Sequence, residues 1–110
     1  MLAKDVYLAT EAMPRSELYG LTSQIRRAAI SVVSNIAEGQ GRLTKGEFQQ
    51  FLGHSRGSLL ELETQLEISV ELGFIAVEAF RKLAPEMAEV RRLLNGLIES
   101  LRVARAAAAS

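Results

Sequence analysis

The sequence predicts an all-α protein, an up-down antiparallel four-helix bundle, and three observations lead to this fold class. Apolar residues recur at alternating spacings of three and four in three long segments, as in helices that pack along one face. No segment shows the strict apolar-polar alternation of a half-buried strand. The connections between segments are short, which favours antiparallel neighbours. At this length we expect a single domain over residues 1–110.

The first predicted helix is short. Residues 2–13 are amphipathic, and Pro14 should end this helix because the residue before a proline disfavours the helical region. Ser16 is a candidate N-cap for the segment that follows. Gly20 is expected to leave a kinked or 3₁₀ first turn before the main second helix settles near Thr22.

The second helix is the segment around which the rest of the chain is organised. It should end near Glu38, with Gly39 as a left-handed C-terminal cap. Asn35 lies in its otherwise apolar seam, where it either fixes register through hydrogen bonds or lies at a wet, open end of the bundle. The seam residues are Leu21, Ile25, Ala28, Val32, Asn35 and Gly39.

The third helix has clear start and stop signals. Residues 44–47 read T-x-x-E, a capping box, and Gly73 is a natural stop after Leu72. The seam between these signals keeps the three-four spacing throughout. Its members are Phe48, Leu52, Ser55, Leu59, Leu62, Leu66, Ser69 and Gly73.

The fourth helix is predicted from about Ala76 toward Arg105. Pro85 lies inside it and should either kink the helix or mark a later start near Ala84. Residues 106–110 have nothing to pack against and are expected to fray. The seam consists of Phe80, Leu83, Met87, Val90, Leu94, Leu97, Leu101 and Ala104.

Two helices also have unusual faces opposite their seams. Ile30, Val33 and Ala37 form a second apolar patch on the second helix, and Arg26 joins it, so this face is a candidate contact with another chain. Gly53 and Gly57 lie four apart on the back of the third helix. Because glycine costs about 1 kcal/mol inside a helix, they are either merely tolerated or mark close approach by another helix.

Polar residues of the second and third helices suggest a further cluster. The arginines and Asn35 near the helix ends form either a salt-bridge network between helices or a site for an anionic ligand. Acidic residues of the third helix could join it, since residues 47–73 have a net charge of −4 between two segments of +2. The candidate network comprises Arg27, Asn35, Glu38, Arg42, Arg56, Glu61 and Glu63.

Composition and motifs exclude several classes of function. Formal charge is zero, which argues against general nucleic-acid binding, and the absence of cysteine removes thiolate chemistry. The single histidine, His54, has no Glu-x-x-His partner of the di-iron type, so we predict no catalytic residue, no metal site and no cofactor. Without a signal-like start or a long apolar run, a cytoplasmic protein with no membrane contact is expected.

Two motifs resemble those of small four-helix-bundle proteins first noticed as reading frames in intervening sequences of bacterial 23S ribosomal RNA genes. R-R-A-A-x-S followed by N-I-A-E-G spans residues 26–39, and R-G-S-x-x-E-x-E spans residues 56–63. The resemblance covers nearly the whole chain. It implies a cytosolic bundle that, in some members, assembles as a homopentamer.

The resemblance extends to the accessory proteins of diversity-generating retroelements, which are basic pentameric barrels that bind nucleic acid. This chain departs from them in its zero net charge and in a first helix that looks truncated at its N-terminus. We therefore expect a non-enzymatic, self-assembling bundle, a homopentamer. The alternative is an RNA-binding or ribosome-associated module that uses arginines such as Arg42, Arg91, Arg92, Arg102 and Arg105.

Overall fold

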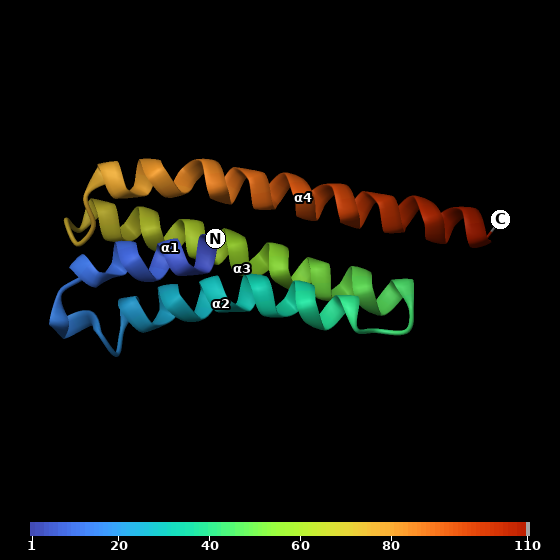
Figure 1. The fold of residues 1–110 in the computed structure, drawn as a ribbon, viewed down its shortest axis with the longest axis horizontal. Helices are drawn as coiled ribbons and strands as arrows, with labels where there is room; N and C mark the ends of the chain where they lie inside the picture. The colour runs from blue at the N-terminus through green and yellow to red at the C-terminus, as the bar shows by residue number, and fades with distance from the viewer. Residues whose placement is uncertain (110) are drawn as a thin grey trace.

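The computed structural model describes residues 1–109 and contains, within them, four α-helices and no strand (Figure 1). The helices alternate in direction along the long axis, so the predicted all-α, up-down antiparallel bundle is confirmed. Two 3₁₀ turns, η1 and η2, connect the first two helices. The elements are α1 (Leu2–Ala9), η1 (Thr10–Ala12), η2 (Arg15–Glu17), α2 (Leu21–Gln40), α3 (Lys45–Glu71) and α4 (Val77–Ala109).

The bundle has two unequal halves because α1 is short. α2 and α4 both pack along α3, and α1 packs between α2 and α4 on the other side. However, α1 has 8 residues whereas α2 has 20. Figure 1 shows that α1 begins near the middle of the bundle, so it does not reach the end where α2 passes into α3.

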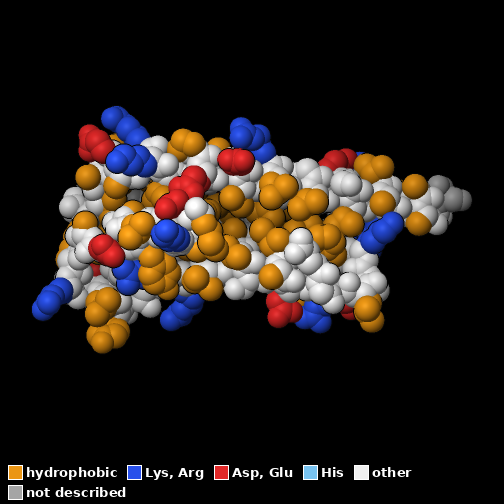
Figure 2. Space-filling view, in the orientation of Figure 1, with side chains coloured by type: hydrophobic (Ala, Val, Ile, Leu, Met, Phe, Trp, Pro, Cys, Tyr) orange, Lys and Arg blue, Asp and Glu red, His pale blue; other side chains and the backbone are white. Residues whose placement is uncertain are grey.

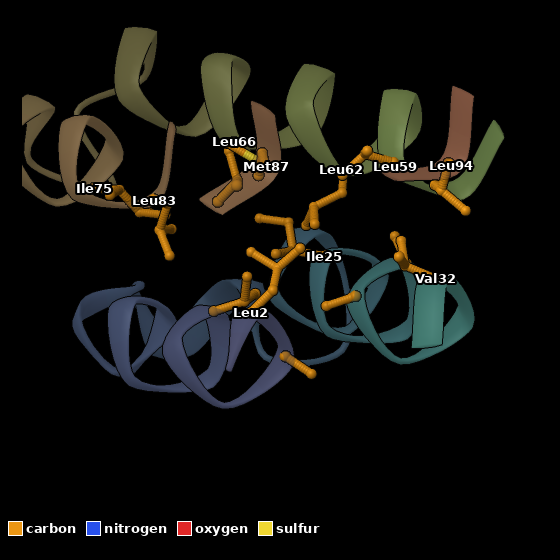
Figure 3. Packing of buried hydrophobic residues seen from close by; sticks show 14 of the residues in the cluster. Leu2, Ile25, Val32, Leu59, Leu62, Leu66, Ile75, Leu83, Met87 and Leu94 are labelled. Carbon is orange, nitrogen blue, oxygen red and sulfur yellow. The ribbon is translucent and has the colours of Figure 1, made fainter. Parts of the chain in front are cut away.

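The predicted seams form the core. Leucine, isoleucine, valine and methionine side chains from all four helices meet along the bundle axis (Figure 3). Two buried serines in the α3 seam are satisfied by backbone carbonyls: the Ser55 hydroxyl donates to the carbonyl of Val32 at 2.7 Å, and Ser69 donates to Gln65 at 2.9 Å. Because buried polar groups need partners, the Ser55 bond also fixes α3 against α2.

The connection from α1 to α2 differs in part from the prediction. The chain leaves the α-helix at Ala9 and continues as a 3₁₀ turn to Ala12, and Met13 is extended before Pro14, as the proline requires. The prediction of Ser16 as an N-cap was wrong, because Ser16 lies inside η2 and makes no cap. α2 begins at Leu21 after a 3₁₀ turn and Gly20, close to the expected start.

Gly39 has a different role from the predicted cap. α2 continues through it to Gln40, and Gly39 is buried within the helix. A Cβ at Gly39 would lie 2.8 Å from Cδ1 of Phe48 and 3.0 Å from Cβ of Phe51. The absent side chain therefore lets α3 approach α2, which the sequence spacing alone could not distinguish from a helix stop.

Both ends of α3 follow the predicted local chemistry. The Thr44 hydroxyl accepts a hydrogen bond from the Glu47 amide at 3.1 Å, which confirms the N-terminal cap. At the other end Gly73 has a φ of +75°, the left-handed conformation that glycine favours. The amide of Phe74 donates to the Ser69 carbonyl at 2.8 Å and that of Gly73 to Val70 at 3.0 Å, a Schellman motif.

α4 is one continuous helix of 33 residues that includes Pro85. Pro85 and Arg81 are both exposed, so the Arg81 carbonyl that loses its helical partner can bind water instead. The predicted fraying was wrong for residues 106–109, which are helical, while Ser110 lies outside the described residues. The end of α4 projects beyond the loop between α2 and α3 (Figure 1).

Candidate self-association surface

The outer flank of α2 presents apolar side chains to solvent. Ile30 is 46% exposed and Val33 is 37% exposed, and Ala37 is exposed one turn further on. The opposite side of the same helix is buried, with Ile25 and Val32 at 0% and 1%. α2 therefore has two apolar faces, and the chain itself covers only one of them.

Arg26 lies at the α1 end of this flank and is held within the chain. Its Nε donates to the Thr10 hydroxyl at 2.9 Å, and its guanidinium lies 4.6 Å from the centre of the Tyr7 ring. A second contact joins its Nη2 to the Tyr7 carbonyl at 3.4 Å. Arg26 therefore attaches α1 and η1 to α2, and Ile30, Val33 and Ala37 remain as the open part of the flank.

The back of α3 has open space at both predicted glycines. A Cβ at Gly53 or Gly57 would meet nothing within 4 Å. Leu60 follows on the same side and is 54% exposed. No helix among residues 1–109 makes the predicted close approach, so it remains a prediction for a second chain.

These two surfaces lie on different sides of the bundle. The α2 flank continues from Arg26, which contacts α1, so it faces the α1 side. α3 lies across the bundle from α1, because each of them packs between α2 and α4. The glycines lie on the outer side of α3, away from its buried seam.

Residues of the two sequence motifs meet where α2 packs on α3. The hydroxyls of Ser31 and Ser58 are hydrogen bonded at 2.8 Å. The Asn35 amide donates to the Ser31 hydroxyl at 2.9 Å and to the Ser31 carbonyl at 2.8 Å, so its bonds stay within α2. Arg27 and Glu61 line an adjacent cavity of about 180 Å³ with both serines. Among residues 1–109, Arg27 makes no ion pair.

The remaining members of the predicted polar network lie apart. At the end of α2, Arg42 pairs with Glu38 at 3.1 Å, and its guanidinium lies 4.6 Å from the Phe51 ring centre. Glu61 accepts a hydrogen bond from Gln65 at 3.1 Å. These contacts are local, within one helix or at one bundle end.

Two further members of the network face α4 instead of α2. Arg56 donates to the Asn95 side-chain oxygen at 3.3 Å, and Glu63 pairs with Arg91. The structure therefore separates the seven predicted residues into several contacts, because α3 directs Arg56 and Glu63 toward α4 and directs Ser58 toward α2. Gln65, 8% exposed, retains an unpartnered side-chain oxygen.

Sequence reasoning did not anticipate the carboxyl pair between α1 and α4. The hydrogen bond between Asp5 and Glu86 lowers the pKa of Asp5. Partial burial, followed by the same hydrogen bond, raises the pKa of Glu86. The amino group of Met1 lies 3.5 Å from Asp5 and 3.8 Å from Glu86. No sequence motif joins residues so far apart.

Most of the arginines that the nucleic-acid hypothesis requires already contact other side chains of the chain. Arg102 donates to both carboxylate oxygens of Glu99, at 2.9 and 2.6 Å, which lowers the pKa of Glu99. Arg105 donates to the Gln49 side chain at 2.6 Å. Arg42 and Arg91 pair with carboxylates as described above, while Arg92 is exposed. Arg42, Arg102 and Arg105 nevertheless lie toward the same end of the bundle.

Residues 1–109 offer few groups for metal or membrane chemistry. No three His, Asp or Glu side chains among them are placed to hold a metal ion. His54 packs edge-on against Phe51, with ring centres 6.0 Å apart. None of the described helices combines the length and the apolar character needed to cross a bilayer.

Comparison with known proteins gives one family. Residues 1–96 match a family model described as 23S rRNA-intervening sequence protein. The matched range contains α1, α2, α3 and α4 as far as Gly96, so it includes both sequence motifs. No curated protein matches the chain.

Proposed function

This chain belongs to the family of 23S rRNA-intervening sequence proteins, and we propose that it is a non-enzymatic bundle that assembles with copies of itself. The observation that carries the proposal is the second apolar face of α2. Ile30 and Val33 keep 46% and 37% of their surface exposed. Burying the rest of each would contribute about 1 kcal/mol, and contiguous exposed apolar residues are typical of interaction sites.

The back of α3 is the partner surface that fits this face. A ridge formed by Ile30, Val33 and Ala37 can approach closely where Gly53 and Gly57 have no side chain. Because the two surfaces lie on different sides of the bundle, the contact is head-to-tail, and such contacts generate rings when the rotation closes. The family resemblance makes five the expected number of copies.

Charge supports the same pairing of surfaces. Residues 1–46 have a net charge of +2 and residues 47–73 a net charge of −4. Arg27 borders the α2 flank, while Glu67 and Glu71 are exposed on α3; none of the three makes an ion pair among residues 1–109. A basic α2 surface against an acidic α3 surface would favour the correct orientation of neighbouring copies.

Replacement of Ile30 by glutamate tests this function. Ile30→Glu should dissociate the assembly, because it would bury an unpaired carboxylate, while helicity stays unchanged since Ile30 does not belong to the core. Light scattering and circular dichroism measure the two quantities. Val77→Glu is the matched control, because Val77 is also a half-exposed helical residue, 39%, but lies at the start of α4.

Gly57→Leu tests the other side of the contact. A Cβ at Gly57 would meet nothing within 4 Å in its own chain, so the fold should persist while the neighbouring helix is excluded. An assembly of unchanged mass in both Ile30→Glu and Gly57→Leu would refute the proposed contact.

The alternative function, an RNA-binding or ribosome-associated module, is supported by the arginines at one end of the bundle. Repetition of Arg42, Arg102 and Arg105 around a ring would concentrate positive charge at its rim. Filter binding to structured RNA at low and physiological salt separates the two functions. Because Arg42 and Arg102 already pair with carboxylates, we expect no retained affinity at about 150 mM salt. Saturable binding that persists there would favour the RNA module.

A further inference from the structure

A cavity lies at the end of the bundle where η1 and η2 connect α1 to α2 (Figure 1). Its volume is about 310 Å³, which is within the range of small-molecule pockets. Three of its lining residues are buried: Thr10, Met13 and Thr22. The outer surface at this end mixes basic, acidic and hydrophobic side chains (Figure 2). Selectivity for a ligand therefore has to come from the groups that line the cavity.

Arg26 lines the cavity and is fixed in position by its own chain. Its Nε donates to the Thr10 hydroxyl at 2.9 Å, and its Nη2 donates to the Tyr7 carbonyl at 3.4 Å. Nη1 donates to no group of residues 1–109, and no carboxylate among them pairs with Arg26. A partly buried guanidinium that only neutral groups hold in place keeps its charge and its Nη1 donors for an anion.

Thr22 adds a second unused polar group to the same cavity. The residue is 3% exposed, and its hydroxyl makes no hydrogen bond within residues 1–109. Buried hydroxyls normally have partners, because an unpaired one is costly. Threonine in a helix uses two χ1 rotamers, so rotation of the side chain can direct the hydroxyl toward a ligand in the cavity. The cavity therefore combines one uncompensated cation with one unpaired hydroxyl.

We propose that this cavity binds a small organic carboxylate. The carboxylate would accept hydrogen bonds from Arg26 and Thr22. The apolar part of the molecule would pack against the remaining walls, which include Met13, Pro14 and Leu18. At the volume that a water molecule occupies in the liquid, about 30 Å³, the cavity has room for a ligand of about ten heavy atoms.

The charge of the lining favours a monoanion. Glu11 and Arg15 are exposed residues of the lining and have opposite charges, so Arg26 supplies the net charge of +1. A carboxylate neutralises this charge. A phosphate monoester has a charge close to −2 at neutral pH, so it would leave excess negative charge beside Glu11.

The proposal is independent of self-association. None of Ile30, Val33 and Ala37 lines this cavity, and neither open glycine of α3 does. Arg26 and Leu18 also line a neighbouring depression, but Thr22 and Met13 line only the cavity described here. A change at Thr22 therefore distinguishes this cavity from its neighbour.

Calorimetric titration with 3-phenylpropionate and with its neutral amide tests the proposal. We expect one acid molecule to bind per chain with a Kd of about 1 mM or tighter, as a ligand of this size allows. The amide should bind at least tenfold more weakly, because it lacks the charge that Arg26 recognises. Equal affinities for acid and amide, or no saturable binding of the acid, would overturn the proposal.

Thr22→Val removes the hydroxyl and keeps the shape of the side chain. It should weaken binding of the acid about tenfold, which is the usual effect of losing a hydrogen bond to a charged group. Its melting temperature should not fall, because this hydroxyl makes no hydrogen bond in the free chain. Thr64→Val, the same change at an exposed position of α3, is the matched control and should leave binding unchanged. An unaltered Kd in Thr22→Val would contradict the assignment.

Arg26→Gln should abolish measurable binding. Because Arg26 also attaches α1 to α2, circular dichroism has to show that this variant is folded, and Thr22→Val decides the question if it is not. Wild-type affinity in folded Arg26→Gln would overturn the proposal.

The Ile30→Glu variant separates this proposal from the proposed function. It should bind the acid as the parent chain does, since Ile30 does not line the cavity. Binding by Ile30→Glu alone would mean that a neighbouring copy occupies the cavity in the assembly, which overturns the carboxylate proposal and supports self-association. Binding by a parent chain that is monomeric would support the carboxylate site and refute the proposed function.

Discussion

At the scale of single residues, the glycines of this chain have different physical roles. Gly39 lets the Phe48 and Phe51 side chains approach α2, whereas Gly73 supplies a left-handed conformation at the end of α3. Gly53, Gly57 and Gly96 have open space around them. Only the first two are required by the fold of one chain, so substitution should distinguish them from the others.

Gly39→Ala should therefore destabilise the monomer fold by about 1–3 kcal/mol, the usual cost of overpacking. The new methyl would overlap the Phe48 ring and the Phe51 Cβ. Gly96→Ala is the matched control, since the same change in open helical surface should stabilise by up to about 1 kcal/mol. Urea unfolding followed by circular dichroism measures both. Equal stabilities for the two variants would show that α2 and α3 are not in close contact at Gly39.

At this scale, contacts within one helical turn were predictable from the sequence, whereas contacts between distant segments were not. The Thr44 cap and the Gly73 stop depend on residues within one turn, and both predictions were confirmed. Gly39 was interpreted as a cap because its contact, Phe48, lies across a loop. The predicted polar network does not form one cluster. Arg56 contacts Asn95 of α4, because the position of a residue around the α3 axis decides which neighbouring helix it faces.

At the scale of elements, α1 is attached to the bundle by polar contacts as well as by Leu2, Ala3 and Val6 in the core. Arg26 fixes its C-terminal side, and the Asp5–Glu86 pair joins its other side to α4. Because the pKa of Glu86 is raised on folding, its contribution to stability is present below its ordinary value of 4.5 and is lost as pH rises through the folded value.

The pair makes the docking of α1 sensitive to pH in both directions. The lowered pKa of Asp5 gives the opposite dependence, a contribution that is lost as pH falls through its folded pKa. As pH rises from the pKa of Glu86 to neutrality, the melting temperature of Glu86→Gln should therefore fall less than that of the parent chain. Thermal unfolding by circular dichroism measures this, with Glu67→Gln as an exposed control on α3. An identical pH slope in parent and Glu86→Gln would disprove the coupling.

The long helices were predictable because their seams repeat over many turns. The seams of α3 and α4 supply Leu59, Leu66, Leu83 and Leu94 to the core as predicted. Element ends were less predictable, because α4 is helical to Ala109 although residues 106–109 are exposed and the sequence suggested fraying.

At the scale of the whole molecule, one chain leaves an apolar surface of α2 uncovered. Ile30, Val33 and Ala37 lie exposed on its flank. The open glycines of α3 are the complementary surface that we propose for this flank. The proposed contact joins identical copies head-to-tail.

A head-to-tail contact whose rotation closes would give a ring. A ring has a mass well above that of one chain, whereas a monomer would leave the exposed Ile30 and Val33 without a partner.

The molar mass of the unmodified chain in solution tests this account most directly. Light scattering on fractions from a sizing column, over a range of concentrations, should give a fixed multiple of 12.0 kDa. A mass of 12.0 kDa at every concentration would contradict self-association.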